Sequence, residues 1–98
     1  MVTFRTYDSS LAFFKLCKTL RLPYYLKDQL LRAASSITLN LAEGAGKESK
    51  KEQKRFYGIA YASLRECKAV FDLHDVKDLN KQADDLGAMI YCLIKSRR

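Results

Sequence analysis

Apolar residues recur at steps of three and four along most of the chain, and this spacing predicts helices. The first helix is expected over residues 9–21, with an earlier start as the alternative because Phe4 and Tyr7 continue its apolar stripe backwards. The second is expected over 24–43 and the third over 50–73, with a fourth beginning after a cap at Asp78. Alternating β-branched runs and Asn-Gly hairpin turns are missing from the sequence, so strands are not expected. The pattern therefore predicts an all-α single domain over residues 1–98, arranged as an antiparallel up-and-down four-helix bundle.

Local signals predict where the helices begin and end. Asp8 or Ser9 can cap the first helix with a side-chain oxygen. The glycines in residues 44–46 are expected to end the second helix, because glycine takes the left-handed cap conformation without a Cβ clash. Ser49 and Glu52 have capping-box spacing, so the third helix should restart at a well-defined place.

The second predicted helix is apolar over most of its circumference. Two apolar strips run along it, one of Leu26, Leu30, Ala33, Ile37, Leu41 and Gly44, and one of Leu31, Ala34, Leu39 and Ala42. A helix of this kind is buried on more than one side. In a small bundle this means either a central position or a contact with another copy. In a chain of 98 residues the contact with another copy is favoured, so we expect a homo-oligomer.

The third predicted helix has a narrower core stripe. Its members are Phe56, Ala60, Leu64, Cys67 and Phe71, with Tyr57 and Tyr61 at the flank. The two tyrosines lie one turn apart and could stack on unpaired bases. Packing in the core or between subunits is the favoured alternative for both.

Composition is that of a folded globular protein, with 48% apolar and 30% charged residues. A net charge of +7 on so small a domain creates a positive field that attracts phosphate polymers or anionic lipid. Cys17, Cys67 and Cys92 lie far apart and are odd in number, so we expect reduced, buried thiols in a cytoplasmic protein. No secretory signal and no apolar run of the roughly 20 residues needed to cross a bilayer are visible, so no membrane association is expected.

Five cations gather where the third helix is expected to begin. They recur at steps of three, one, three and one, and are Lys47, Lys50, Lys51, Lys54 and Arg55. Each cation at a helix N-terminus is unfavourable by about 0.3–1 kcal/mol, and Glu48 and Glu52 offset only part of this. Because exposed N–H groups at a helix start also favour anions, we interpret the cluster as a phosphate contact. The alternative is a solvated charged face. Lys95, Arg97 and Arg98 near the end of the sequence could either extend this positive surface or be solvated in the same way.

Catalytic and metal-binding patterns are not readable in the sequence. His74 is the only histidine, and no Ser/His/Asp or Cys/His arrangement accompanies it. We therefore predict no catalytic residue, no metal site and no cofactor.

A resemblance to a known family is carried by the second and third predicted helices. The matching positions are 28–30, 32–33, 36–37, 40–44, 56, 59–60 and 63–64, with Ser-Ile-x-x-Asn-x-Ala-Glu-Gly at their centre. The sequence resembles the four helix bundle protein family named after the intervening-sequence protein of 23S ribosomal RNA genes, to which accessory variability determinants of diversity-generating retroelements are related. The family's usual proline in the Ser-Ile-Pro run is replaced here by Thr38.

The resemblance implies an antiparallel four-helix protomer, a homopentameric ring and no catalytic centre. For the retroelement branch it also implies a basic surface that binds nucleic acid and a reverse transcriptase partner. Asn40 and Glu43 lie on the narrow polar line of the second helix, where they could bond a neighbouring helix or subunit and fix its register. We assign to assembly the residues Ser36, Ile37, Asn40, Glu43 and Gly44.

These observations lead to one principal functional hypothesis and one alternative. The principal hypothesis is a non-enzymatic, oligomeric scaffold whose basic stripe binds RNA or DNA, as an accessory protein of a reverse transcriptase. The alternative is a protein-interaction module that docks an acidic protein surface, which is the expectation for the rRNA intervening-sequence protein branch of the family.

Overall fold

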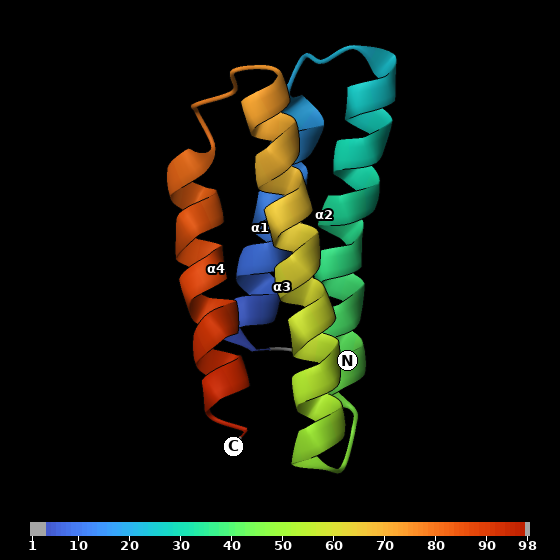
Figure 1. The fold of residues 1–98 in the computed structure, drawn as a ribbon, viewed down its shortest axis with the longest axis vertical. Coiled ribbons are helices and arrows are strands. Elements are labelled where there is room, and N and C mark those ends of the chain that lie inside the picture. Colours follow the sequence, from blue (N-terminus) through green and yellow to red (C-terminus); the bar gives the residue numbers. More distant parts are fainter. Residues whose placement is uncertain (1–3, 98) are drawn as a thin grey trace.

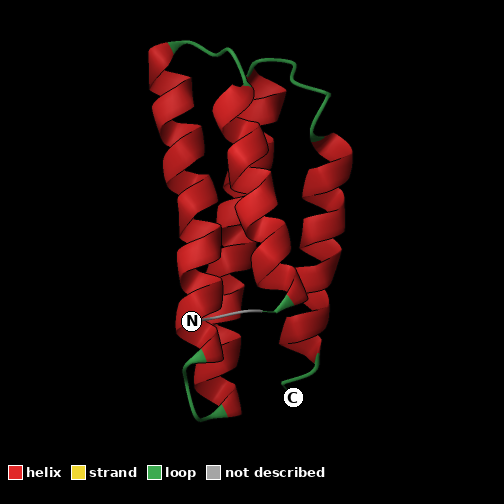
Figure 2. Cartoon of the chain, turned by 180° about the vertical axis from the view of Figure 1, so that it is seen from behind, coloured by secondary structure: helices red, strands yellow, loops and turns green. Residues whose placement is uncertain are grey.

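Four helices pack side by side around one core in the computed structural model, which describes residues 4–97 (Figure 1). Their bounds are α1 Arg5–Thr19, α2 Tyr24–Ala45, α3 Lys50–Leu73 and α4 Asn80–Lys95. Over the described residues the chain contains helices and connections but no strand, which confirms the all-α prediction (Figure 2). The bundle is elongated, with extents of 40 × 22 × 19 Å.

Helix α2 contacts α3 along most of its length. Near the end of α2, Gly44 lies against Tyr57 of α3, and about two turns earlier Ser36 bonds Ser63. Near the start of α2, Gln29 donates to Glu66. Helix α1 contacts α2 and α4, and α4 contacts α3.

Helices α1 and α4 begin without the side-chain caps that the sequence predicts. Helix α1 already begins at Arg5, after Phe4 in extended conformation, so Asp8 and Ser9 lie inside the helix and do not cap it. Phe4 packs against the core and continues the apolar stripe backwards, in agreement with the alternative of an earlier start. Helix α4 begins at Asn80 without a side-chain cap. The predicted caps for α1 and α4 are therefore wrong, whereas α2 and α3 begin at the predicted residues.

The glycines at the end of α2 act differently from the prediction. Gly46 is in the right-handed region (φ −86°, ψ −5°), and no glycine in residues 4–97 has positive φ. Gly44 lies within the helix, where an added Cβ would be 2.7 Å from Cε1 of Tyr57. The left-handed cap is thus wrong, and Gly44 is required for close helix approach instead.

The core is built from all four helices. Phe13 of α1 meets Phe71 of α3 edge-on, with ring centroids 6.2 Å apart. In α3 the space beside Gly44 is filled by Tyr57, which is 1% exposed, and Phe56 is only half-buried. The predicted core stripe therefore contained the wrong aromatic residue of this pair. The space left by the missing side chain of Gly44 is filled from position 57 of α3 and not from position 56.

The thiols differ in exposure. Cys17 and Cys67 are buried as expected, but Cys92 is exposed because α4 turns that side of its helix outward. Burial raises the pKa of Cys17 to about 12, although Lys27 acts in the opposite direction. Burial also raises the pKa of Cys67, and the neighbouring Cys17 and Glu66 add to the effect.

Apolar side chains also remain at the surface. Helix α2 exposes Tyr24, Tyr25 and Leu39, with Leu39 at 68%. None of the helices within the described residues is long and apolar enough to cross a membrane.

Candidate nucleic-acid interface

The start of α3 is fixed by a side-chain cap. The hydroxyl of Ser49 accepts from the backbone N–H of Glu52 at 3.1 Å, which confirms the first half of the predicted capping box. The carboxylate of Glu52 turns the other way and accepts from Nε of Arg55 at 3.0 Å. The acid of the box is therefore used to hold a cation on the following turn.

Two of the five predicted cations are held by contacts within the chain. Nζ of Lys47 lies 3.1 Å from a carboxylate oxygen of Glu43, and Arg55 pairs with Glu52. Both also contact the ring of Phe56, with the Lys47 ammonium 5.2 Å and the Arg55 guanidinium 4.4 Å from its centroid. The half-buried ring of Phe56 therefore contacts both of these cations.

The other three cations are not neutralised in this way. Lys50, Lys51 and Lys54 are exposed, and within residues 4–97 none of them has a carboxylate within 4.0 Å. They lie on the first turns of α3, where the helix dipole is positive. This arrangement leaves three positive charges available to an external anion.

Further cations come from the end of α4 and the residues after it. The sequence alone did not decide whether they extend the positive surface. Nε of Arg97 donates to Oε1 of Gln53 at 3.1 Å, and Nε2 of Gln53 donates to the carbonyl of Lys47 at 2.9 Å. The Arg97 guanidinium also lies 5.2 Å from the centroid of Tyr57. These contacts bring residues 44 positions apart together, and no spacing in the sequence indicates this. Arg98 lies outside the described residues.

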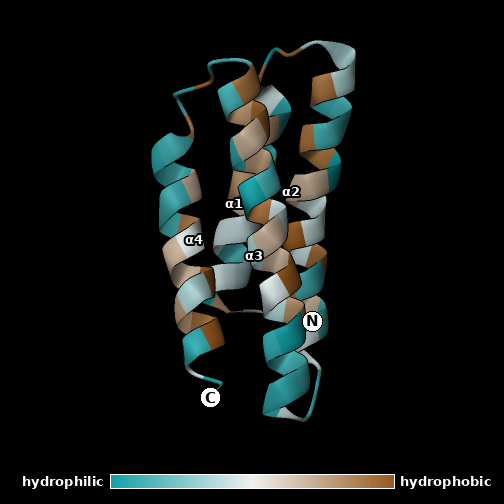
Figure 3. Ribbon diagram, viewed as in Figure 1, coloured by the Kyte–Doolittle hydropathy of each residue, from teal (hydrophilic) through white to brown (hydrophobic). Residues whose placement is uncertain are grey.

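We call the resulting surface the basic end. It comprises Lys47, Lys50, Lys51, Lys54 and Arg55 with Lys95 and Arg97. In Figure 3 the beginning of α3 forms a hydrophilic block at the same end of the bundle as the last turn of α4. The chain thus gathers cations from α3, from the α2–α3 connection and from the end of α4.

The two tyrosines predicted as stacking candidates occupy different environments. Tyr57 is 1% exposed and packs in the core, so its ring face is not available to a base, in line with the packing alternative. Tyr61 is half-buried and its centroid lies 6.4 Å from that of Tyr91 on α4. Tyr91 is 48% exposed and was not among the predicted residues.

The five residues assigned to assembly make contacts inside one chain. The hydroxyls of Ser36 and Ser63 are 2.8 Å apart, and Nδ2 of Asn40 donates to the Ser36 carbonyl at 2.9 Å. Ile37 is fully buried, Gly44 packs against Tyr57, and Glu43 pairs with Lys47 at the surface. Ser36 and Gly44 thus contact α3 directly, whereas Asn40 bonds within α2 and Glu43 bonds to the connection that follows it.

Metal ligands do not converge in the described part of the chain. No group of three or more His, Cys, Asp or Glu side chains lies close enough to hold an ion there.

Together the fold and the surface define a small all-α protein with a strongly basic end. The model of the 23S rRNA-intervening sequence protein family matches residues 2–92, and the chain therefore belongs to this family. This confirms the family part of the resemblance. A comparison with curated proteins found no match.

Proposed function

We propose that this protein is a non-enzymatic cytoplasmic scaffold that binds RNA or DNA at its basic end. The observation that carries the proposal is the state of Lys50, Lys51 and Lys54, which are exposed on the first turns of α3 without a carboxylate partner among residues 4–97. Stability alone would favour acids at these positions. A bound phosphate would interact favourably with the lysines, with the helix dipole and with the first N–H groups of the helix at once.

Binding at this surface is directed to the nucleic-acid backbone. Lysine ammonium groups neutralise phosphates as point charges and do not read base edges. The guanidinium of Arg55 is held by Glu52 and Phe56, which reduces its freedom to form bidentate contacts with guanine. We therefore expect affinity to depend strongly on salt and weakly on sequence.

The proposed function also includes assembly of several copies of the chain into a complex. We propose an antiparallel up-and-down protomer, since the pairs Gly44–Tyr57, Ser36–Ser63 and Gln29–Glu66 support opposite directions for α2 and α3. The family resemblance supports a ring of five subunits and a reverse transcriptase of the diversity-generating retroelement type as partner. The exposed Leu39 supports a contact between copies. Several basic ends in one ring would engage one nucleic acid with higher avidity than a single copy.

The experiment compares two triple variants with equal charge change. Lys50, Lys51 and Lys54 are replaced by glutamine in the first, and the exposed Lys15, Arg21 and Lys77 are replaced by glutamine in the second. We expect fluorescence anisotropy at fixed moderate salt to show weaker binding of a labelled oligonucleotide for the first variant only. Equal loss in both variants would assign binding to net charge and overturn the proposed site.

The alternative function, docking of an acidic protein surface, uses the same cations. It predicts that protein purified in high salt captures a protein partner from nuclease-treated extract and does not bind oligonucleotides. Binding of oligonucleotides by purified protein, lost on replacing Lys50, Lys51 and Lys54, would favour the nucleic-acid function.

A further inference from the structure

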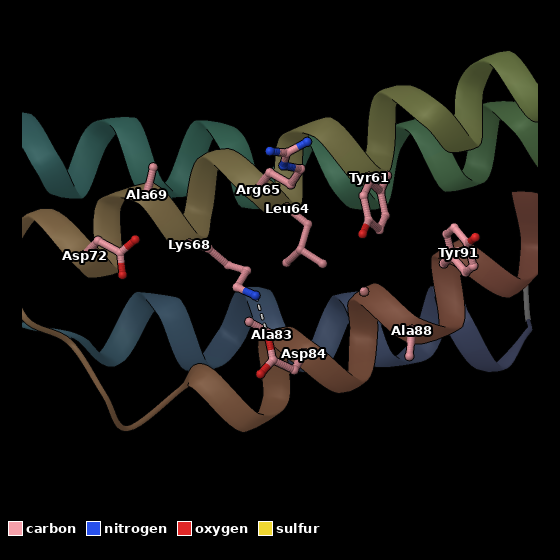
Figure 4. Close-up of a pocket in the computed structure, with 11 residues that line it drawn as sticks. Tyr61, Leu64, Arg65, Lys68, Ala69, Asp72, Ala83, Asp84, Ala88 and Tyr91 are labelled. Atoms are coloured by element: carbon pink, nitrogen blue, oxygen red, sulfur yellow. Dashed lines mark hydrogen bonds and ion pairs between the residues drawn. The ribbon is translucent and has the colours of Figure 1, made fainter.

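A groove of about 590 Å³ runs between α3 and α4 (Figure 4). Its α4 side consists largely of small residues, Ala83, Gly87 and Ala88, and Leu64 contributes an apolar surface from α3. Because these α4 side chains are short, the two helices leave space between them. A flat, apolar group fits a groove of this kind better than a phosphate backbone does.

The two ends of the groove differ. At one end Tyr61 and Tyr91 point toward each other from α3 and α4, with centroids 6.4 Å apart (Figure 4). Further along the groove, Nζ of Lys68 lies 2.6 Å from a carboxylate oxygen of Asp84 and bridges the two helices. Asp72 also lines this part. Arg65 lines the groove as well, so its two acids and two cations carry no net charge. The cations that would attract a phosphate lie beyond the tyrosine end.

The tyrosine end adjoins the basic end. Lys54 and Tyr61 are seven residues apart on α3, which is about two turns, so they lie on the same side of the helix. On α4, Nζ of Lys95 lies 5.4 Å from the ring centroid of Tyr91. Cations therefore accompany both tyrosines on the side toward the basic end.

We propose that the tyrosine end of this groove binds an unpaired base of a single-stranded nucleic acid whose phosphates contact the basic end. The inference rests on the proposed function and adds a preference for single strands over duplex. Bases in a duplex are paired and stacked, so their faces cannot reach an aromatic ring, whereas unpaired bases stack on tyrosine irrespective of sequence. Tyr91 keeps 48% of its surface exposed, which leaves part of its ring open to such a base.

The test compares labelled dT20 with the dT20·dA20 duplex by fluorescence anisotropy. We expect the unmodified protein to bind dT20 more tightly than the duplex at equal salt. Tyr91→Ala should weaken dT20 binding about tenfold and leave duplex binding unchanged, since stacking acts only on unpaired bases. Tyr91→Phe should retain dT20 binding, because the ring is preserved. Labelled rU20 measured in parallel identifies whether RNA or DNA is the better ligand.

A matched control and a second variant keep the test interpretable. Tyr25→Ala removes a tyrosine that is 71% exposed at the start of α2, and it should leave both affinities unchanged. Tyr61→Leu probes the opposite wall, with circular dichroism as the check of folding, and should weaken dT20 binding in the same way. If Tyr91→Ala and Tyr61→Leu both bind dT20 as the unmodified protein does, or if the duplex is preferred, the groove inference is overturned while the basic-end proposal stands. If neither probe binds the unmodified protein, both are overturned.

Discussion

Gly44 of α2 and Tyr57 of α3 are in such close contact that no side chain fits between them. An added Cβ at Gly44 would lie 2.7 Å from Cε1 and 2.9 Å from Cδ1 of the Tyr57 ring, which is 1% exposed. The last turn of the Ser-Ile-x-x-Asn-x-Ala-Glu-Gly run thereby positions the first turns of α3, which carry the unpaired lysines.

Gly44→Ala is predicted to destabilise the protein by about 1–3 kcal/mol, because the buried ring must shift to make room. Gly58 of α3 provides the matched control, since an added Cβ there meets nothing within 4 Å. Gly58→Ala should raise stability by about 0.5–1 kcal/mol through the lower helix propensity of glycine. Urea unfolding followed by circular dichroism measures both. Equal effects of the two substitutions would show that contact with Tyr57 is not the reason why position 44 requires glycine.

Thr38→Val is predicted to lower the free energy of unfolding by about 1 kcal/mol, the value of one hydrogen bond. The Ser10 hydroxyl is 1% exposed, donates to the Tyr7 carbonyl at 2.7 Å and lies 2.8 Å from Oγ1 of Thr38. Because its one proton goes to Tyr7, Ser10 accepts from Thr38, and valine would leave this acceptor without a donor. Thr19→Val, at an exposed threonine that bonds only within α1, should change stability by less than about 0.5 kcal/mol. A thermal or urea series with no difference between the two variants would contradict the role assigned to Thr38.

The thiols are predicted to react in two classes. Cys92 is exposed and should react with a thiol reagent in the folded protein, whereas Cys17 and Cys67 should react only after unfolding. Counting modified thiols with and without denaturant measures this directly. Rapid modification of all three cysteines in buffer would mean that the core around Cys17 and Cys67 opens readily.

Stability is predicted to fall as pH rises above about 9. The ordinary pKa of a cysteine is 9.0, and burial raises the pKa of Cys17 to about 12 and also raises that of Cys67. Above pH 9 the unfolded chain therefore loses thiol protons that the folded chain keeps, and each such group lowers the free energy of unfolding by up to about 1.4 kcal/mol per pH unit. The contribution is fully present below pH 9 and is lost progressively toward pH 12. Urea unfolding from pH 8 to 10.5 should show that the free energy of unfolding falls more steeply in the unmodified protein than in the Cys17→Ala/Cys67→Ala variant. Parallel pH curves for the two proteins would contradict this role of the buried thiols.

Much of the fold could be predicted from periodicity, whereas among the predicted side-chain caps only that of α3 is present. Helix α3 begins and ends where predicted, because Ser49 and the following apolar stripe are local signals. The choice between Phe56 and Tyr57 for the core could not be made, since they are adjacent and the decision depends on Gly44 of another helix. Exposure of Cys92 likewise depends on how α4 is rotated against α1 and α3.

Part of the candidate site could also be predicted from the sequence. The spacing from Lys47 to Arg55 places the cations together, because all five lie within or next to one helix. Which of them are paired depends on rotamers, and the structure separates Lys47 and Arg55 from the other three. Tyr91 comes from α4 and Arg97 from the residues that follow it, and only tertiary packing brings them to α3.

The most direct test of the central claim is the salt dependence of oligonucleotide binding. For single strands the slope of log K against log salt is about −0.7 for each phosphate neutralised. Replacing Lys50, Lys51 and Lys54 by glutamine should therefore make the slope for dT20 less steep by about 2, whereas the variant at Lys15, Arg21 and Lys77 should keep the slope of the unmodified protein. Identical slopes for the unmodified protein and the first variant would contradict phosphate binding at the basic end.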